Sequence, residues 1–175
     1  GLQGRELRNL TVGILGTGKI GAAVIKNLSG FGCRILASDI RENPSLKGLC
    51  TYVDNETLYK ACDIISLHMP LLESTRHFVN AETIARMKDG VTIINCARGE
   101  LMNIPDMIRG IETQKIGALA LDVFDKEDGI YHENRRDDII SNRDMAYLRQ
   151  FPNVIMTQHM AFYTDAAVQS MVFCG

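Results

Sequence analysis

The sequence predicts an α/β domain built on a doubly wound parallel sheet with helices on both faces. Three observations lead to this fold class. Short apolar runs rich in β-branched residues recur along the chain, segments with helical spacing lie between most of them, and a glycine-rich turn follows the first run. Because strands that are apolar on both faces need cover on both sides, the alternation favours a parallel sheet. The strands are expected at residues 11–15, 33–38, 63–68, 91–95, 117–122 and 153–157.

The helices are predicted from apolar positions three and four residues apart between these strands. Two groups have this spacing clearly, and they are Ile20, Ala23, Val24 and Leu28, and Ile104, Met107, Ile108 and Ile111. Asn80 and Asn103 stand where capping side chains would begin helices. Residues 125–144 are highly charged and too long for a simple connection, which is typical of functional loops, although RDMAYL at 143–148 predicts the start of a helix.

Length, composition and charge are those of one ordinary globular domain. The chain has 175 residues, of which 46% are apolar and 23% charged, and its formal net charge is −2. Nucleic acids and anionic membranes usually bind clustered Lys and Arg, so this charge argues against both partners and favours a small ligand. No apolar run reaches the length of a membrane span, and the first residues lack a signal-peptide pattern. We therefore expect a cytoplasmic protein.

The cysteines and the chain ends complete this general picture. No C-x-x-C pair and no histidine at metal-ligand spacing accompanies the cysteines, so we expect reduced thiols and no metal. The chain does not begin with Met and stops at QSMVFCG, inside an expected helix, so we interpret it as a piece of a longer protein. The five cysteines are Cys33, Cys50, Cys62, Cys96 and Cys174.

The glycine-rich turn GTGKIG directly follows the first strand and opens the first helix. Gly16, Gly18 and Gly21 form the G-x-G-x-x-G pattern of dinucleotide-binding Rossmann domains. Gly16 permits a tight turn, Gly18 lets the backbone approach a pyrophosphate, and Gly21 lets the helix pack closely on the strand. The alternative is a tight turn without a ligand, but the setting between strand and helix favours the nucleotide site.

Asp39 ends the second strand, 18 residues after Gly21. The dinucleotide fingerprint expects an acid near this distance, where it binds the ribose hydroxyls and repels a 2′-phosphate. Asp39 therefore favours NAD over NADP, although Arg41 two residues later leaves NADP open. Taken without the glycines, Asp39 is more simply a turn residue at a strand end.

The remaining strands also end in polar residues. Because the carboxyl ends of parallel strands meet at one edge of the sheet, we expect these side chains to lie on the same rim as the glycine turn. Singly, each has a simpler explanation, such as a core histidine or a capping acid. We place His77 and His132 on the surface, and we interpret Cys96 from the residues alone as a small buried filler. The rim residues are His68, Arg98, Asp122 and His159.

Five segments together carry a resemblance to a known family, and they are GTGKIG, DIISLHMPLLEST, NCARGEL, ALDVFDKEDGIY and PNVIMTQHMAFYT. In this order and at these spacings they resemble the NAD-binding domain of the D-isomer-specific 2-hydroxyacid dehydrogenases, most closely the D-lactate dehydrogenase branch. The resemblance covers essentially residues 1–175. It implies that a second, substrate-covering domain is absent from this chain.

The resemblance also implies roles for single residues. Arg98 matches the substrate-binding arginine, His159 the proton donor and acceptor, and Glu127 the acid that partners the histidine. The choice of Glu127 over Asp125 and Asp128 depends on the resemblance alone. The implied cofactor contacts are Gly16, Gly18, Lys19, Ile20 and Gly21 at the phosphate turn, Asp39 at the adenosine ribose, Met69, Pro70 and Thr75 along the cofactor, and Cys96, Ala97, Arg98, Asp122 and His159 around the nicotinamide.

Two positions depart from the family pattern without removing a reacting group. Gln158 replaces the proline that commonly precedes the histidine, which we expect to loosen the backbone there. Asn103 stands where an aspartate is usual.

The function implied is reversible hydride transfer between NADH and a short 2-keto acid such as pyruvate, in a homodimer. A guanidinium at Arg98 suits this chemistry, because it matches the planar carboxylate of the substrate with two parallel hydrogen bonds. Three alternatives stay open: a dehydrogenase of larger branched or aromatic 2-keto acids, a non-enzymatic NAD-responsive binding module, and a methyltransferase that uses the glycine turn for S-adenosylmethionine.

Overall fold

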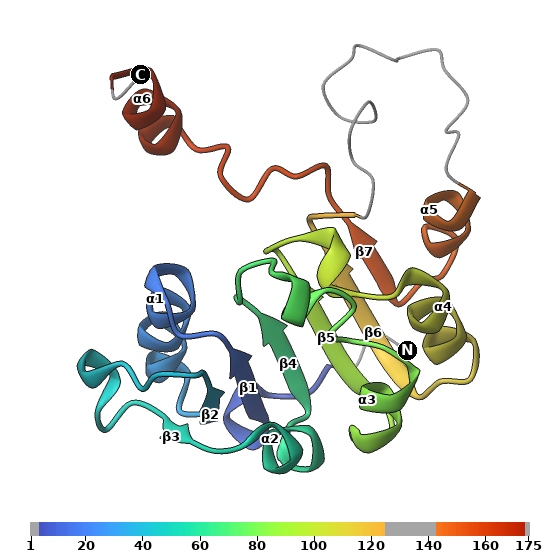
Figure 1. The fold of residues 1–175 in the computed structure, drawn as a ribbon, viewed down its shortest axis with the longest axis horizontal. Helices are drawn as coiled ribbons and strands as arrows, with labels where there is room; N and C mark the ends of the chain where they lie inside the picture. Colours follow the sequence, from blue (N-terminus) through green and yellow to red (C-terminus); the bar gives the residue numbers. More distant parts are fainter. Residues whose placement is uncertain (1–3, 125–142, 174–175) are drawn as a thin grey trace.

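The computed structural model describes residues 4–124 and 143–173 and shows one parallel sheet of seven strands (Figure 1). The strand order is β3-β2-β1-β4-β5-β6-β7, and every neighbouring pair is parallel. This confirms the predicted fold class. The strands are β1 (Thr11–Leu15), β2 (Arg34–Ser38), β3 (Thr51–Tyr52), β4 (Ile64–Leu67), β5 (Val91–Asn95), β6 (Ile116–Leu121) and β7 (Val154–Met156).

Helices connect the strands as the apolar spacing predicts. Asn80 and Asn103 cap α3 and α4, since their side-chain oxygens accept hydrogen bonds from amides in the first turn. The RDMAYL segment forms α5. The last helix lies at the end of an extended segment that leads away from β7 (Figure 1). The α-helices are α1 (Lys19–Leu28), α2 (Asn55–Ala61), α3 (Ala81–Arg86), α4 (Ile104–Glu112), α5 (Arg143–Leu148) and α6 (Asp165–Phe173).

Two apolar cores lie on opposite faces of the sheet. On one face, Ala22 and Ile25 of α1 pack against Val12 and Ile14 of β1 and their neighbours in β2. On the other face, buried residues of α2, α3, α4 and α5 form a single cluster with the strands. Successive residues of a strand point to opposite faces, so β1 contributes to both cores. The cover is thinner at the edge strand β7, where Ile155 is 66% exposed.

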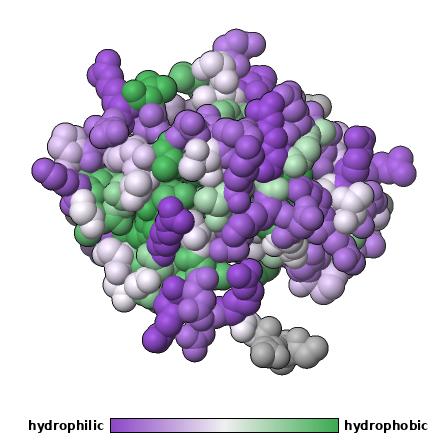
Figure 2. Space-filling view, turned by 90° about the horizontal axis from the view of Figure 1, so that it is seen from below, coloured by the Kyte–Doolittle hydropathy of each residue, from purple (hydrophilic) through white to green (hydrophobic). Residues whose placement is uncertain are grey.

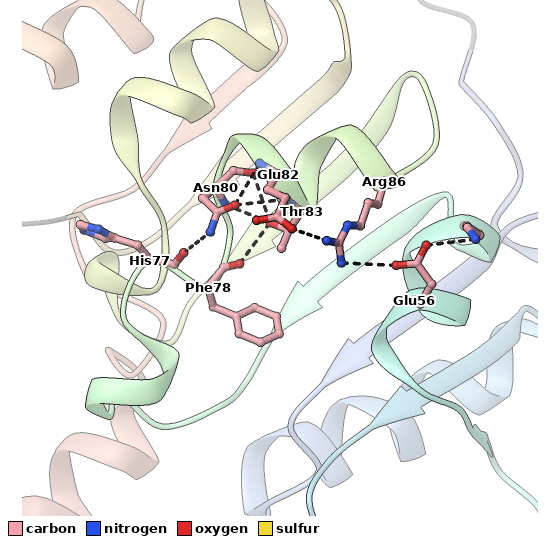
Figure 3. A network of polar contacts seen from close by, with 8 residues as sticks. Glu56, His77, Phe78, Asn80, Glu82, Thr83 and Arg86 are labelled. Carbon is pink, nitrogen blue, oxygen red and sulfur yellow. Dashed lines mark hydrogen bonds and ion pairs between the residues drawn. The ribbon is translucent and has the colours of Figure 1, made fainter.

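A polar network joins α3 to α2 on the face of the sheet that these two helices cover (Figure 3). The Asn80 side chain accepts hydrogen bonds from the amides of Glu82 and Thr83, which fixes the start of α3. At the end of α3, Arg86 forms ion pairs with Glu82 and with Glu56 of α2. Exposed ion pairs of this kind contribute at most about 1 kcal/mol each, so the network fixes how α3 lies beside α2 more than it adds to the free energy of unfolding.

The molecular surface is mixed in character. Figure 2 shows that hydrophobic residues gather on the left half of the face seen from below, on the side where Figure 1 places α1 and β3. The rest of that face is mostly hydrophilic. None of the helices within residues 4–124 and 143–173 is long and apolar enough to cross a membrane.

Candidate functional site

The glycine turn after β1 shows why glycine is needed at two of its positions. Gly16 has φ +94°, and a β-carbon there would lie 2.7 Å from the backbone of His68. A β-carbon on Gly21 would lie 2.0 Å from the Gly16 carbonyl oxygen, so α1 approaches the turn as closely as the motif predicts. Gly18 is different, since a β-carbon on it would meet only open space. Its freedom leaves room for a ligand at the start of α1, where Lys19 and Ile20 are exposed.

Asp39 follows β2 and binds the glycine turn directly. Its Oδ2 accepts hydrogen bonds from the Thr17 amide at 2.6 Å and from the Thr17 hydroxyl at 3.1 Å. Its Oδ1 accepts one longer bond, from the Arg41 amide at 3.3 Å. Burial alone would raise the pKa of this carboxyl group, but the amide and hydroxyl donors outweigh it and hold the pKa below its ordinary value. The side chain is exposed, so Oδ1 has room for a further donor.

The turn after β4 lies against the glycine turn. His68 contacts Gly16 there, and its Nε2 lies 2.8 Å from the Ser66 hydroxyl. Burial lowers the His68 pKa, so the ring is neutral near pH 7. The predicted cofactor residues Met69 and Pro70 come next, and the Thr75 hydroxyl donates to the Pro70 carbonyl at 2.7 Å. Thr75 therefore closes this loop.

Arg98 lies on a short loop after β5, and the buried Asn95 side chain forms hydrogen bonds to the backbone of this loop. Asn95 is fully buried, its Nδ2 donates to the Arg98 carbonyl at 2.8 Å, and its Oδ1 accepts from the Ala97 amide at 3.0 Å. The Arg98 side chain is exposed, and Nη1 donates to the Ala97 carbonyl at 2.7 Å. Within the described part of the chain, Arg98 forms no ion pair with Glu100. The guanidinium thus faces solvent on the rim.

Cys96 corrects one interpretation made from the residues alone. We interpreted it as a small buried filler, but its side chain is exposed. It lies one residue beyond Asn95, where β5 and its alternation of buried positions have ended. Partial desolvation and the nearby Asp122 carboxylate raise the pKa of the thiol, so it is protonated near pH 7.

Asp122 follows β6 and holds the loop that carries His159. It is 5% exposed, and Oδ1 accepts bonds from the Thr157 hydroxyl at 2.5 Å and the Met160 amide at 2.8 Å. Oδ2 accepts from the Ala161 amide at 2.8 Å. Burial tends to raise the pKa of this carboxyl group, but these donors and the nearby His159 keep the pKa below its ordinary value. Both oxygens are therefore engaged within the chain.

His159 stands in the bend that Asp122 closes. Its φ is +52°, a left-handed conformation that is uncommon for residues other than glycine. Its ring makes an edge-to-face contact with Phe162, with centroids 6.2 Å apart. Asp122 binds the hydroxyl of Thr157 before His159 and the amides of Met160 and Ala161 after it, so the loop is held on both sides of Gln158. The loosening expected from Gln158 stays a prediction.

The sheet brings the predicted site residues to one edge. Each group follows the carboxyl end of a parallel strand, with β1, β2 and β4 adjacent on one side and β5, β6 and β7 adjacent on the other. The common rim predicted for His68, Arg98, Asp122 and His159 is therefore confirmed. Among the rim residues, sequence reasoning missed Asn95, whose signal is a polar residue at the end of an apolar strand.

The other predicted residues lie outside the group of rim residues or outside the described ranges. His77, which we placed on the surface, is partly exposed. Among the residues that the structure describes, no three His, Cys, Asp or Glu side chains group in a way that would hold a metal ion. The residues that lie outside the described ranges are Glu127, its alternatives Asp125 and Asp128, and His132 and Cys174.

Comparison with known proteins agrees with this geometry. Residues 1–161 match the model of the D-isomer specific 2-hydroxyacid dehydrogenase family, NAD binding domain. The chain belongs to this family. The resemblance seen in the sequence is thus confirmed, and NAD is the cofactor of the domain.

Curated relatives match nearly the whole chain. An aromatic 2-oxoacid reductase of Clostridium sporogenes is 46% identical over 173 residues, which cover 98% of this chain and 52% of the reductase. A D-lactate dehydrogenase of Lactobacillus delbrueckii subsp. bulgaricus is 42% identical, over 97% of this chain and 51% of that enzyme. The chain therefore spans about half the length of the curated relatives it matches.

A solved structure extends the comparison to three dimensions. The D-isomer specific 2-hydroxyacid dehydrogenase of Lactobacillus delbrueckii ssp. bulgaricus, in its NAD-complexed form, superimposes with a TM-score of 0.94 at 36% identity. The match covers 99% of this chain and 52% of that one. The order and orientation of the strands in this chain are thus those of a 2-hydroxyacid dehydrogenase domain.

Proposed function

We propose that this chain is the NAD-binding domain, residues 1–175, of a D-lactate dehydrogenase-like enzyme. The enzyme transfers hydride reversibly between NADH and a short 2-keto acid such as pyruvate. The observation that carries the proposal is that Arg98 and His159 stand on the same sheet edge as the glycine turn. A carboxylate-binding cation and a proton-transfer group beside a dinucleotide site are the parts that reduction of a 2-keto acid requires.

The residues present fit a bound dinucleotide. Open space faces Gly18 at the start of α1, where amides without helical partners suit a pyrophosphate. The Asp39 side chain is exposed, and its Oδ1 suits a ribose hydroxyl. By resemblance, Lys19 and Ile20 flank the phosphates, Met69, Pro70 and Thr75 line the cofactor, and Cys96, Ala97 and Asp122 lie around the nicotinamide. When bound, the reduced nicotinamide supplies the hydride.

The chain's own residues then orient the substrate and move the proton. Arg98 binds the substrate carboxylate through two parallel hydrogen bonds, which fixes the carbonyl carbon beside the cofactor. In the reductive direction the His159 imidazolium donates its proton to the developing alkoxide, and in the oxidative direction the neutral ring accepts it. Glu127, assigned by resemblance, stabilises the charged imidazolium.

The setting of the whole enzyme is part of the proposal. A second domain, absent from this chain, covers the substrate and excludes water. The proposal is supported by the length of the relatives, of which this chain matches about half. The protein acts as a homodimer in the cytoplasm on a small 2-keto or 2-hydroxy acid, without nucleic acid or membrane partners.

One relative supports a second candidate substrate class. The reductase that is 46% identical to this chain is named for aromatic 2-oxoacids. A preference for larger 2-keto acids is therefore the second candidate, and a pocket on the absent domain would decide it.

Steady-state assays of the full-length protein with NADH test the proposal. The expected result is reduction of pyruvate to the D-isomer, with phenylpyruvate and 4-methyl-2-oxopentanoate as competing substrates. A higher kcat/KM for phenylpyruvate would replace the first candidate by the second. NADH binding without turnover of any 2-keto acid would favour a binding module and contradict the enzyme. An Arg98→Gln variant should lose activity through a raised KM, because its amide cannot replace the charged bidentate contact.

A further inference from the structure

Thr17, the middle residue of the Gly16-Thr17-Gly18 turn, is held by a network that the dinucleotide motif does not require. It is 3% exposed, and both its amide and its hydroxyl donate to Asp39. The Tyr52 hydroxyl donates to the Thr17 hydroxyl at 2.8 Å, and the Asn43 Nδ2 donates to the Thr17 carbonyl at 3.1 Å. The Asn43 amide in turn donates to the Tyr52 hydroxyl at 2.8 Å. The network joins the turn after β1 to the residues that follow β2 and to β3.

The hydrogen bonds of this network run in one direction. A backbone amide only donates, so the Tyr52 oxygen accepts from Asn43 and the phenol proton points to Thr17. The Thr17 hydroxyl oxygen accepts the hydrogen bond from Tyr52. The Thr17 hydroxyl in turn donates a hydrogen bond to Oδ2 of Asp39, since an ionised carboxylate only accepts. The chain of donors therefore ends on the one charged group in the network. Loss of either hydroxyl leaves a buried or partly buried group without its partner.

The consequence for Asp39 is that its two oxygens have different tasks. Oδ2 takes both bonds from Thr17, which fix the carboxylate plane, while Oδ1 takes the longer bond from Arg41. A fixed, ionised Oδ1 is a good acceptor for one ribose hydroxyl. It also cannot turn away from a 2′-phosphate, so its repulsion of NADPH is not relieved.

We propose that Thr17 and Tyr52 are positioning residues that fix Asp39 for the adenosine ribose and so contribute to the preference for NADH over NADPH. The inference rests on the ribose role proposed for Asp39. Neither residue touches the reacting atoms, so the effect is expected in cofactor affinity and selectivity rather than in the chemical step.

The test compares hydroxyl deletions in the full-length protein by calorimetric titration with NADH and NADPH. Tyr52→Phe and Thr17→Val should each weaken NADH binding by about 3- to 10-fold, the size expected for one net hydrogen bond. Thr17→Ser keeps the hydroxyl and should bind NADH like the parent. NADPH binding should change much less, so the ratio of the NADPH dissociation constant to the NADH dissociation constant should fall. Tyr147→Phe is the matched control, because that hydroxyl is bonded to Glu112 on α4 and lies outside the network.

A double-mutant cycle with Asp39→Asn shows whether the hydrogen-bond network of Thr17 and Tyr52 acts through Asp39. In the Asp39→Asn background, Tyr52→Phe should cause no further loss of NADH affinity. Equal weakening of NADH and NADPH binding by Tyr52→Phe would overturn the positioning role of Thr17 and Tyr52 and leave the ribose role of Asp39 intact. An undiminished loss of NADH affinity on adding Tyr52→Phe to Asp39→Asn would have the same meaning. If Asp39→Asn itself left NADH affinity unchanged, both the ribose role and the positioning role would be wrong. Thermal unfolding of each variant separates these effects from loss of the fold, and the Val and Ser variants of Thr17 decide the matter if Tyr52→Phe fails to fold.

Discussion

The ends of β2 and β6 place the same kind of residue in the same position with different results. Asp39 and Asp122 each come directly after a strand, and in both the hydrogen-bond donors keep the pKa low against the effect of burial. Asp122 is 5% exposed, and both its oxygens bind the loop around His159. Asp39 is exposed, and one of its oxygens is held while the other has room for a ligand.

The role of an acid at a strand end thus depends on its exposure and on how many of its carboxylate lone pairs already accept hydrogen bonds from the chain. The β2 end presents a carboxylate outward and suits cofactor recognition. The β6 end turns its carboxylate inward and fixes a left-handed backbone at His159, a conformation that costs roughly 1–3 kcal/mol and needs such support. A nicotinamide contact for Asp122, which the resemblance implies, stays a prediction, and it would have to share oxygens that already accept three bonds.

Replacement of His159 gives the largest expected effect. We expect it to affect the chemical step at the β6–β7 side of the sheet and not the binding of NADH. In the full-length enzyme, His159→Gln should lower kcat by about 10² to 10⁴ in both directions, because the general acid and base is lost. NADH affinity should stay near that of the parent. Stopped-flow turnover and fluorescence titration measure the two quantities. A variant that kept its turnover, or lost NADH binding instead, would remove His159 from the chemistry.

Asp122→Asn should give a smaller loss, and it distinguishes support from cofactor contact. The asparagine amide nitrogen cannot accept a bond, so one of the donors from Thr157, Met160 and Ala161 loses its partner at a cost of about 1–3 kcal/mol. We expect kcat to fall by about 10- to 100-fold and the midpoint of thermal unfolding to fall as well. Asp165→Asn, at the exposed start of α6, is the matched control. Unchanged kcat in Asp122→Asn would mean that the His159 loop keeps its geometry without the carboxylate.

The smallest expected effect concerns His68, which lies against the glycine turn. Burial lowers its folded-state pKa, whereas the unfolded chain takes up the proton near pH 6.5. Protonation therefore favours the unfolded state, and the folded protein should lose stability as the pH falls below about 6.5. His68→Gln should make the thermal unfolding midpoint less dependent on pH in this window. The control is His77→Asn, since His77 is partly exposed and asparagine tolerates its positive φ. An equally steep pH dependence in His68→Gln would contradict the burial effect.

The fold could be predicted largely because its signals are local. Apolar runs and helical spacing marked six of the seven strands and the helix starts at Asn80 and Asn103. The missing strand, Thr51–Tyr52, has two residues, which is too short to show alternation. Likewise, the exposure of Cys96 depends on where β5 ends, and strand boundaries are poorly marked in a sequence.

The site could be predicted in outline but not in its internal bonds. Parallel strands bring their carboxyl ends together, so the rim follows from the strand assignment. The bond from Thr17 to Asp39 spans 22 positions and the bond from Ala161 to Asp122 spans 39, and no periodic pattern reports contacts at such separations. The sequence therefore marks both acids alike, and only the packed structure distinguishes them.

NADH titrations of Asp39→Asn and Asp122→Asn, side by side in the full-length protein, test this division of roles most directly. We expect Asp39→Asn to weaken NADH binding by about tenfold, the effect expected when a hydrogen bond to a charged group is lost, and to bring the NADH and NADPH dissociation constants closer together. We expect Asp122→Asn to bind NADH within about twofold of the parent. Comparable losses of NADH affinity in both variants, or a loss in Asp122→Asn alone, would show that the two acids do not differ as their exposure and bonding require.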